Sequence, residues 1–170
     1  DSVFVKTDED EIILCLNYDG LYGINNLNRF LQESNENVPY EWGVQQYKVG
    51  DPVLFNESER FAPVIYNNMK GKIRNIVKSW DRIQGEKITF DIELDKVLDG
   101  LDASGRDFEI VDGYSCENTV IRFTVFKRRS EDDDDDTTSN TIIPFQVAYA
   151  VSIHKAQGLE YDSVKVVITN

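Results

Sequence analysis

One short segment in the last fifth of the sequence carries side chains that could bind phosphates and sugars. Within nine positions it places a hydroxyl, an imidazole, an ammonium, a carboxamide, a glycine and a carboxylate, at Ser152, His154, Lys155, Gln157, Gly158 and Glu160. A hydroxyl and a ring N–H can donate hydrogen bonds to phosphates. A glycine lets the backbone approach a phosphate without a Cβ in the way, and a carboxylate can accept from a ribose hydroxyl.

Histidine and cysteine, the residues that bind zinc or form disulfides, are few in this chain. His154 is the only histidine, and the two cysteines, Cys15 and Cys116, are far apart with no C-x-x-C pair. The sequence therefore predicts neither a zinc site nor a disulfide framework, and reduced cysteines are the simpler interpretation. A lone histidine in a polar loop is more often a structural hydrogen-bonding group than a ligand contact, so the role of His154 depends on its neighbours.

The elements that must position this segment are strands of an α/β sheet. Residues 142–150 are apolar and 164–168 are strongly β-branched, so the polar segment lies between two predicted strands. Near the start, the apolar run 11–16 predicts another strand, followed by turn residues at 17–20. Apolar residues then recur at helical spacing from Ile24 until the polar cluster that begins at Ser34.

The loop between this first strand and helix is a second candidate site. Ligands usually bind at the carboxyl ends of strands in α/β sheets, and the backbone N–H groups of Gly23 and Ile24 could contact an anion at the helix start. An ordinary strand-to-helix turn explains the same residues equally well.

Between about residues 44 and 127 the sequence changes to short β-rich runs separated by turns. The runs that predict strands are 52–55, 72–77, 88–94 and 120–126. The last two alternate between apolar and polar residues, which gives each strand one buried and one solvated face. Strands of this length and spacing predict a small barrel inserted into the α/β domain.

The charge of the chain limits its contacts with nucleic acid. A formal net charge of −13 argues against broad, non-specific binding to a phosphate backbone, so any such contact must be local. Part of the excess is the run from Glu131 to Asp136, which cannot bury itself and predicts a solvated loop or linker. The alternative is a decoy that competes with DNA for a basic surface.

The segment from Tyr149 to Glu160 resembles motif V of superfamily 1 DNA helicases, in the RecD-like form T-x-H-K-x-Q-G. Ser152 stands for the threonine and keeps its hydroxyl, and Ala156 stands where serine is common. The resemblance implies DNA contacts at Ser152 and His154. Lys155 is placed with them.

The same resemblance implies an ATP-cleft role for three residues. Gln157 and Gly158 would face the γ-phosphate, and Glu160 would approach the sugar.

Other parts of the chain are similar to the same family. Residues 14–32, with Leu27-Asn28, resemble the strand, loop and helix around motif IV. Residues 49–54 and 66–73 resemble the G-D-x-V and F-N-G-x-x-G signatures of the SH3-like insertion in UvrD-like and RecD-like carboxy-terminal domains. Asn68 stands where glycine is usual, and since asparagine tolerates a positive φ we expect the turn to be kept.

The fold class implied is α/β, a partial RecA-like (P-loop NTPase) second motor domain with an inserted small SH3-like β-barrel. The predicted organisation is a first RecA-like part, the barrel, an acidic linker and a closing part with motif V, at 1–43, 44–128, 129–141 and 142–170. We expect the natural protein to continue beyond this stretch, because it opens on Asp1 and its last predicted strand has no following helix.

The chain is expected to be inactive alone. It contains no G-x-x-x-x-G-K-[ST] phosphate loop and no acidic metal-binding strand motif, so no catalytic residue and no metal ligand is predicted in it. The parent would be an ATP-dependent DNA helicase in which ATP and Mg²⁺ bind between this unit and a first RecA-like domain of the same chain. Single-stranded DNA is the other expected partner.

Three rival interpretations remain open. The chain could be a non-catalytic β-barrel that recruits a protein partner, or a helicase unit fused to an effector for repair or defence. A dehydrogenase-like domain is poorly supported, because no G-x-G-x-x-G follows a predicted strand. No apolar run approaches the roughly 20 residues of a membrane span, and a cytoplasmic location is expected.

Overall fold

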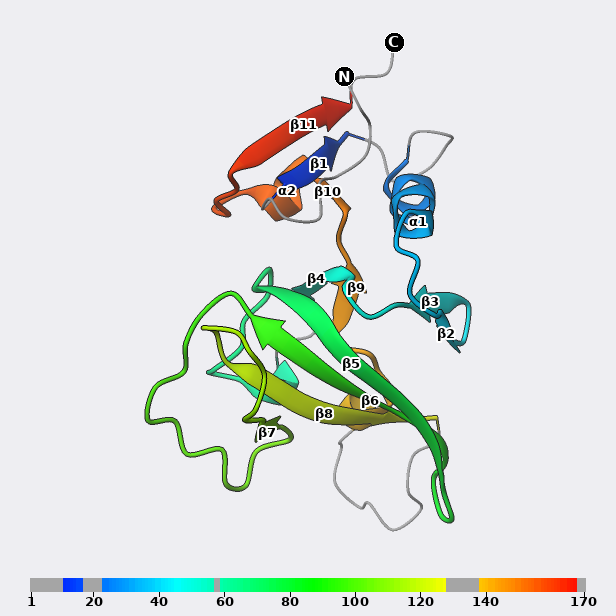
Figure 1. Ribbon diagram of the computed structural model, residues 1–170, viewed down its shortest axis with the longest axis vertical. Coiled ribbons are helices and arrows are strands. Elements are labelled where there is room, and N and C mark those ends of the chain that lie inside the picture. Colours follow the sequence, from blue (N-terminus) through cyan, green and yellow to red (C-terminus); the bar gives the residue numbers. More distant parts are fainter. Residues whose placement is uncertain (1–10, 17–22, 57–58, 128–137, 168–170) are drawn as a thin grey trace. The chain divides into compact units, whose positions relative to one another are not determined.

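The computed structural model describes residues 11–16, 23–56, 59–127 and 138–167, and the chain divides into two compact units (Figure 1). The first unit joins Asp1–Asn37 with Val147–Asn170, and the second is Val38–Gln146. The second unit is therefore inserted into the first along the sequence. No helix in the described ranges is long and apolar enough to cross a membrane.

The first unit is built on a small parallel sheet. Its strands are β1 (Glu11–Cys15), β10 (Ala150–Ser152) and β11 (Ser163–Val167), in the order β10-β1-β11. The middle strand β1 pairs in parallel with both neighbours. Because the strands are parallel, their carboxyl ends lie at the same edge of the sheet, and the loops that follow them begin there.

Helix α1 (Ile24–Glu33) covers one face of this sheet. Its apolar residues at helical spacing pack with strand residues in one cluster, which contains Ile13, Cys15, Ile24, Leu27, Leu31, Tyr149 and Ala150. The helix ends where the Ser34 hydroxyl donates to the Leu31 carbonyl oxygen at 2.6 Å. The predicted strand, helix and helix end in this region are confirmed. The predicted turn at 17–20 lies outside the described residues.

The second unit contains a six-stranded sheet and a separate hairpin. The hairpin pairs β2 (Tyr40–Trp42) with β3 (Gln45–Tyr47). The sheet has the order β7-β8-β6-β5-β4-β9. Its strands are β4 (Pro52–Phe55), β5 (Lys70–Asp81), β6 (Gly85–Leu94), β7 (Glu109–Ile110), β8 (Val120–Phe126) and β9 (Phe145–Val147), and two short 3-10 helices, η1 (Glu59–Phe61) and η2 (Thr138–Thr141), accompany them.

The predicted small barrel does not appear as a closed barrel. Within the described ranges, β7 and β9 are the two edges of an open sheet. Strand β7 has only two residues, and the stretch between β6 and β7 is made of turns and irregular structure, so there are too few ladder hydrogen bonds to close the sheet. The four predicted strands within it are confirmed, and two of them are longer than predicted, at 70–81 and 85–94.

Aromatic rings fill the core of the second unit. The rings of Phe90 and Phe145 meet edge to face with centroids 5.0 Å apart, and Tyr47 contacts both rings in the same manner. Phe55 joins them through Phe145. Edge-to-face pairs of this kind contribute about 0.5 to 1.5 kcal/mol each beyond the area they bury.

The structure explains the residue type at two positions of the predicted F-N-G-x-x-G signature. Asn68 has a φ of 68°, so the positive φ expected there is confirmed. Gly71, at the start of β5, has no room for a side chain, because a Cβ would lie 2.7 Å from the Ile92 Cγ2 atom and 3.0 Å from the Glu93 carbonyl oxygen. The close approach of β5 and β6 therefore requires glycine at position 71.

A buried carboxylate lies on the other face of this sheet. The Asp91 side chain is 1% exposed, and Arg122 donates to both of its oxygens, at 2.6 and 2.8 Å. The Tyr114 hydroxyl donates to Asp91 Oδ2 at 2.6 Å. Burial opposes ionisation of Asp91, but these hydrogen bonds outweigh it and hold the pKa of the carboxyl below its usual value. The network ties the loop that carries Tyr114 to strands β6 and β8.

Candidate functional site

The candidate site begins at strand β10, which α1 holds in place. The Asn28 side chain donates to the Ala150 carbonyl oxygen and accepts from the Ala150 N–H, both at 2.8 Å. On the opposite side of β10, Ile13 N–H donates to the Tyr149 carbonyl oxygen at 3.1 Å. Successive backbone groups of a strand point to alternate sides. Asn28 therefore supplies hydrogen-bond partners to the backbone of β10 at the edge that no strand covers among the described residues.

Ser152, the first predicted DNA contact, lies inside the protein. It is 3% exposed and is the N-cap of α2 (Ile153–Ala156), where its Oγ accepts from the Lys155 N–H at 3.2 Å. Serine is a preferred N-cap because its oxygen satisfies an N–H that the helix leaves free. The hydroxyl thus has a structural task that the sequence interpretation did not assign.

His154 and Lys155 lie on the single turn of α2. His154 is exposed, and Lys155 is half-buried. The structure therefore leaves the imidazole open to a ligand, whereas Lys155 is partly covered.

A tight turn follows α2 and contains two of the predicted ATP-cleft residues. Gln157 has φ −63° and ψ 122°, Gly158 has φ +84°, and Leu159 N–H donates to the Ala156 carbonyl oxygen at 3.0 Å. These values describe a type II turn, which requires a positive φ at its third residue. A Cβ on Gly158 would meet nothing within 4 Å, so the backbone angle and not lack of space favours glycine. Gln157 and Gly158 are both exposed.

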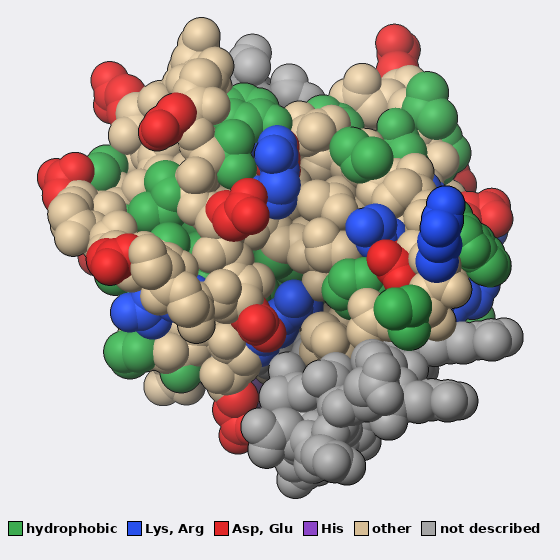
Figure 2. Space-filling model, turned by 90° about the horizontal axis from the view of Figure 1, so that it is seen from below, with side chains coloured by type: hydrophobic (Ala, Val, Ile, Leu, Met, Phe, Trp, Pro, Cys, Tyr) green, Lys and Arg blue, Asp and Glu red, His purple; other side chains and the backbone are tan. Residues whose placement is uncertain are grey.

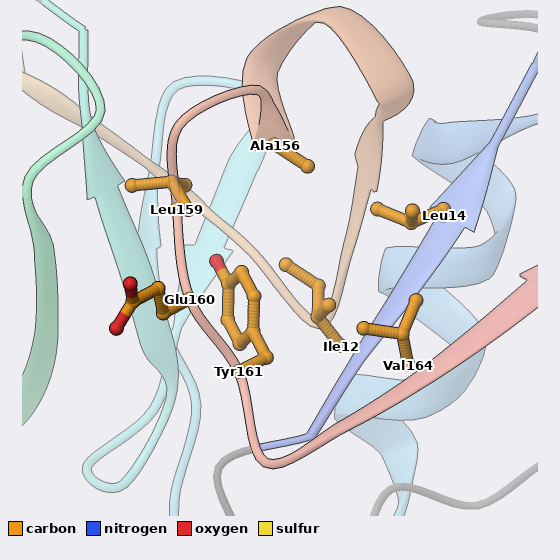
Figure 3. A pocket seen from close by; sticks show the side chains of 7 residues that line it. All are labelled: Ile12, Leu14, Ala156, Leu159, Glu160, Tyr161 and Val164. Atoms are coloured by element: carbon orange, nitrogen blue, oxygen red, sulfur yellow. The ribbon is translucent and has the colours of Figure 1, made fainter.

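The loop that follows this turn forms a pocket with the sheet face opposite α1. The pocket has a volume of about 480 Å³ and is lined by Ile12, Leu14, Ala156, Leu159, Glu160, Tyr161 and Val164 (Figure 3). In Figure 3 the Tyr161 ring lies between Glu160 and Ile12, and the Glu160 carboxylate points away from Leu14 and Val164. The lining is mostly apolar and offers no cation. It suits a flat or alkyl group better than a phosphate.

The exposed apolar residues on this face extend beyond the pocket. Val164 and Val166 are 49% and 52% exposed, and Leu16 at the end of β1 is exposed as well. Parallel sheets are normally covered on both faces. The described residues supply a covering helix, α1, on one face.

The predicted anion contact at Gly23 and Ile24 is placed at the start of α1. Gly23 is the N-cap with φ −75° and ψ 157°, and both residues are buried. Ile24 packs in the cluster that contains Ala150. The predicted ATP-cleft residues do not lie at this helix start. They lie in the loop before β11, at Gln157, Gly158 and the exposed Glu160.

The charged side chains of the described residues are mixed in sign. On the face shown in Figure 2, basic side chains are scattered among acidic ones. Lys165, the cation on β11, is paired with Glu11 at 2.9 Å. No group of three histidine, cysteine or acidic residues within the described ranges could hold a metal ion.

Sequence reasoning missed two residues of this site. Asn28 was recognised only as part of a helix that resembles motif IV, although an asparagine close to the apolar stripe of an amphipathic helix is a sign of a buried hydrogen bond. Tyr161 follows Glu160 directly, but its place in the pocket lining depends on which strands become neighbours, so the sequence gives no signal for it.

No protein-family model matches the sequence, and no curated protein matches it. Among solved structures, the chain is similar to the crystal structure of the Pif1 helicase from Candida albicans, with 17% sequence identity and a TM-score of 0.43. The match covers 91% of this chain and 39% of that chain, so this chain spans well under half the length of the structure it matches.

Proposed function

We propose that the chain is part of the second RecA-like unit of a superfamily 1 DNA helicase, with an SH3-like insertion, and that it couples nucleotide binding to the grip on single-stranded DNA. The observation that carries the proposal is the exposed loop after β10. It presents an imidazole, a carboxamide, a glycine backbone and a carboxylate in the order that motif V predicts, at the carboxyl end of a parallel strand. Ligands of α/β sheets usually bind at that edge.

The local geometry supports coupling between two ligands. Helix α2 has a single turn, with the Ser152 cap at its start and the type II turn of Gln157 and Gly158 at its end. Both boundaries are closed by hydrogen bonds, so a displacement of the turn is transmitted to His154 over a few residues. In the proposed motor, His154 and Lys155 contact DNA phosphates, and Gln157 and Gly158 face the γ-phosphate of ATP.

The residues present fit one wall of an ATP site. The exposed Gln157 carboxamide and Gly158 backbone are suited to phosphate oxygens, and the exposed Glu160 carboxylate is suited to a ribose hydroxyl. A triphosphate with Mg²⁺ needs a phosphate loop and a metal-binding acid as well, which the proposal assigns to a first RecA-like domain of the parent. ATP hydrolysis is therefore proposed for the parent and not for this chain.

The test is ATP turnover by the full-length parent, with and without single-stranded DNA, in the natural protein and in Gln157→Ala. We expect DNA to stimulate turnover and Gln157→Ala to lose that stimulation. Gln45→Ala is the matched control, because Gln45 is an exposed glutamine on β3 of the other unit, and this change should leave the stimulation unchanged.

Two results would contradict the proposal. Absence of turnover under every condition removes the motor and favours a module that recruits a protein partner. Stimulation that survives Gln157→Ala shows that this loop does not couple the two ligands, whatever the rest of the parent does.

A further inference from the structure

The tip of the β5–β6 hairpin carries the most exposed tryptophan of the chain. Trp80 is 75% exposed, and the neighbouring Ile83 in the turn is 77% exposed. The pairing of β6 with β8 ends at Lys87 and Phe126, whereas β5 and β6 stay paired as far as Asp81 and Gly85. The hairpin, green in Figure 1, thus continues beyond the end of β8. An indole here contributes nothing to the aromatic core.

The indole of Trp80 is nevertheless supported. The outer edge of its ring lies over Gly85, where an added Cβ would be 3.8 Å from Trp80 Cη2 and 3.9 Å from Trp80 Cζ2. The turn beneath it is fixed by Asp81, which accepts from the backbone N–H groups of Ile83 and Gln84 at 2.8 and 3.0 Å. A ring that is exposed and also held in place loses little conformational freedom when a flat ligand stacks on it.

The charges around Trp80 favour an anion despite the acidity of the whole chain. The tip and the residue that follows β8 carry four cations and two carboxylates, namely Lys78, Arg82, Lys87, Lys127, Asp81 and Glu86. Both carboxylates are already engaged. Asp81 accepts from the backbone N–H groups of the turn. Glu86 pairs with Lys78 and with Lys127.

The bonds from Lys127 and Lys78, at 2.7 and 2.8 Å, hold the pKa of Glu86 at about 2, so this carboxylate stays ionised and paired. Arg82 is exposed and has no ion pair or hydrogen bond to another described residue. Lys87 lies opposite Ser79, and its Nζ lies 5.9 Å from the centroid of the Phe126 ring, so it projects from the other face of the hairpin than Trp80. Arg82, two positions from Trp80 in the turn, is therefore the cation of the described tip residues that remains available to a ligand.

We propose that the β5–β6 hairpin tip is a second contact for single-stranded nucleic acid, in which an unpaired base stacks on Trp80 while Arg82 contacts a backbone phosphate. Stacking on an aromatic side chain combined with nearby cations is the general way proteins hold single strands without reading sequence. A duplex hides the faces of its bases and is not bound in this way. The identity of the ligand rests on the proposed function, but the site lies in the other unit.

The test uses the fluorescence of Trp80 in the 170-residue chain. The sequence has two tryptophans, so Trp42→Phe leaves Trp80 as the reporter. We expect a thymidylate dodecamer to quench this fluorescence and the same sequence as a duplex to leave it unchanged. Trp80→Ala should weaken binding of a labelled dodecamer by about 5- to 150-fold, since stacking of one base contributes about 1 to 3 kcal/mol.

Matched variants distinguish base stacking from non-specific apolar binding. Ile83→Ala removes an equally exposed apolar side chain of the same turn and should change affinity less than twofold. Arg82→Gln should flatten the slope of log affinity against log salt by about 0.7, for the one phosphate of the single strand that is no longer neutralised. Lys87→Gln removes a cation on the other face of the hairpin and should leave the slope unchanged.

Three outcomes would overturn the inference. The first is a dodecamer that leaves Trp80 fluorescence unchanged. The second is equal loss of affinity in Trp80→Ala and Ile83→Ala, which indicates an apolar docking surface for a protein. The third is affinity that falls with His154→Ala but not with Trp80→Ala, which leaves the proposed function standing without this contact.

Discussion

Asn28 and Ala150 are 122 positions apart in sequence, yet the Asn28 carboxamide pairs with both backbone polar groups of Ala150 at 2.8 Å. The pairing acts as a one-residue substitute for a neighbouring strand at the edge of β10. Ala150 is fully buried, so its N–H and carbonyl groups would otherwise lack partners in an apolar setting. The residue that begins the candidate loop, Ser152, lies two positions farther on. Asn28 therefore fixes the strand from which the loop departs.

Replacement of Asn28 by alanine should destabilise the chain by about 2 to 4 kcal/mol. Two hydrogen bonds are removed and two buried backbone groups are left without partners, each at a cost of about 1 to 3 kcal/mol before any water enters. The measurement is the free energy of unfolding from urea denaturation followed by circular dichroism. Asn25→Ala, at an exposed position of the same helix, is the control and should change stability by less than about 0.5 kcal/mol. Equal effects of the two variants would show that the pairing does not stabilise the fold.

Replacement of Gly158 by alanine should destabilise the loop after α2 by about 1 to 2 kcal/mol. The cost arises from the positive φ of 84°, because open space surrounds the Cβ position. Gly158→Asn should cost less, since asparagine tolerates this backbone region better. Hydrogen exchange of the Leu159 N–H, which closes the turn, reports the effect locally. Identical protection in all three proteins would mean that the turn does not need its glycine.

Replacement of Gly71 by alanine should cost about 1 to 3 kcal/mol for a different reason. The new Cβ would lie 2.7 Å from Ile92 Cγ2, so the two strands must move apart or the isoleucine must shift. Adding Ile92→Ala should make the double variant less unstable than the sum of the two single changes. A strictly additive pair in thermal unfolding would show that these two side chains do not collide.

Local patterns predicted the elements of this fold and missed the contacts between them. The spacing of apolar residues from Ile24 predicts the helix, and alternation in 88–94 and 120–126 predicts two central strands. The predicted small barrel is not confirmed, since the sheet is open among the described residues. Closure depends on the register and length of edge strands such as β7, and a strand of two residues leaves no periodic signal.

The candidate loop was predictable because its residues are neighbours in sequence. Its N-cap is also a local signal, since serine ahead of a short helical turn is a common cap. Long-range pairs give no such signal. Nothing local shows that Asn28 meets Ala150 or that Tyr161 stands beside Ile12, because both contacts depend on which strands become neighbours in the sheet.

Acid should weaken the second unit through Asp91. Its pKa is lower in the folded chain than in the unfolded one, where it is about 3.9, so the stability it contributes is present above that pH and is lost as the pH falls through the folded pKa. Asp91→Asn leaves Arg122 without its bidentate partner and should cost about 2 kcal/mol or more at pH 7. Urea denaturation at several pH values measures both effects. The gap between the natural chain and Asp91→Asn should narrow below about pH 4, whereas Asp112→Asn, at an exposed position, should show no gap at any pH. A gap that stays constant down to pH 2 would mean that the carboxylate charge does not stabilise this network.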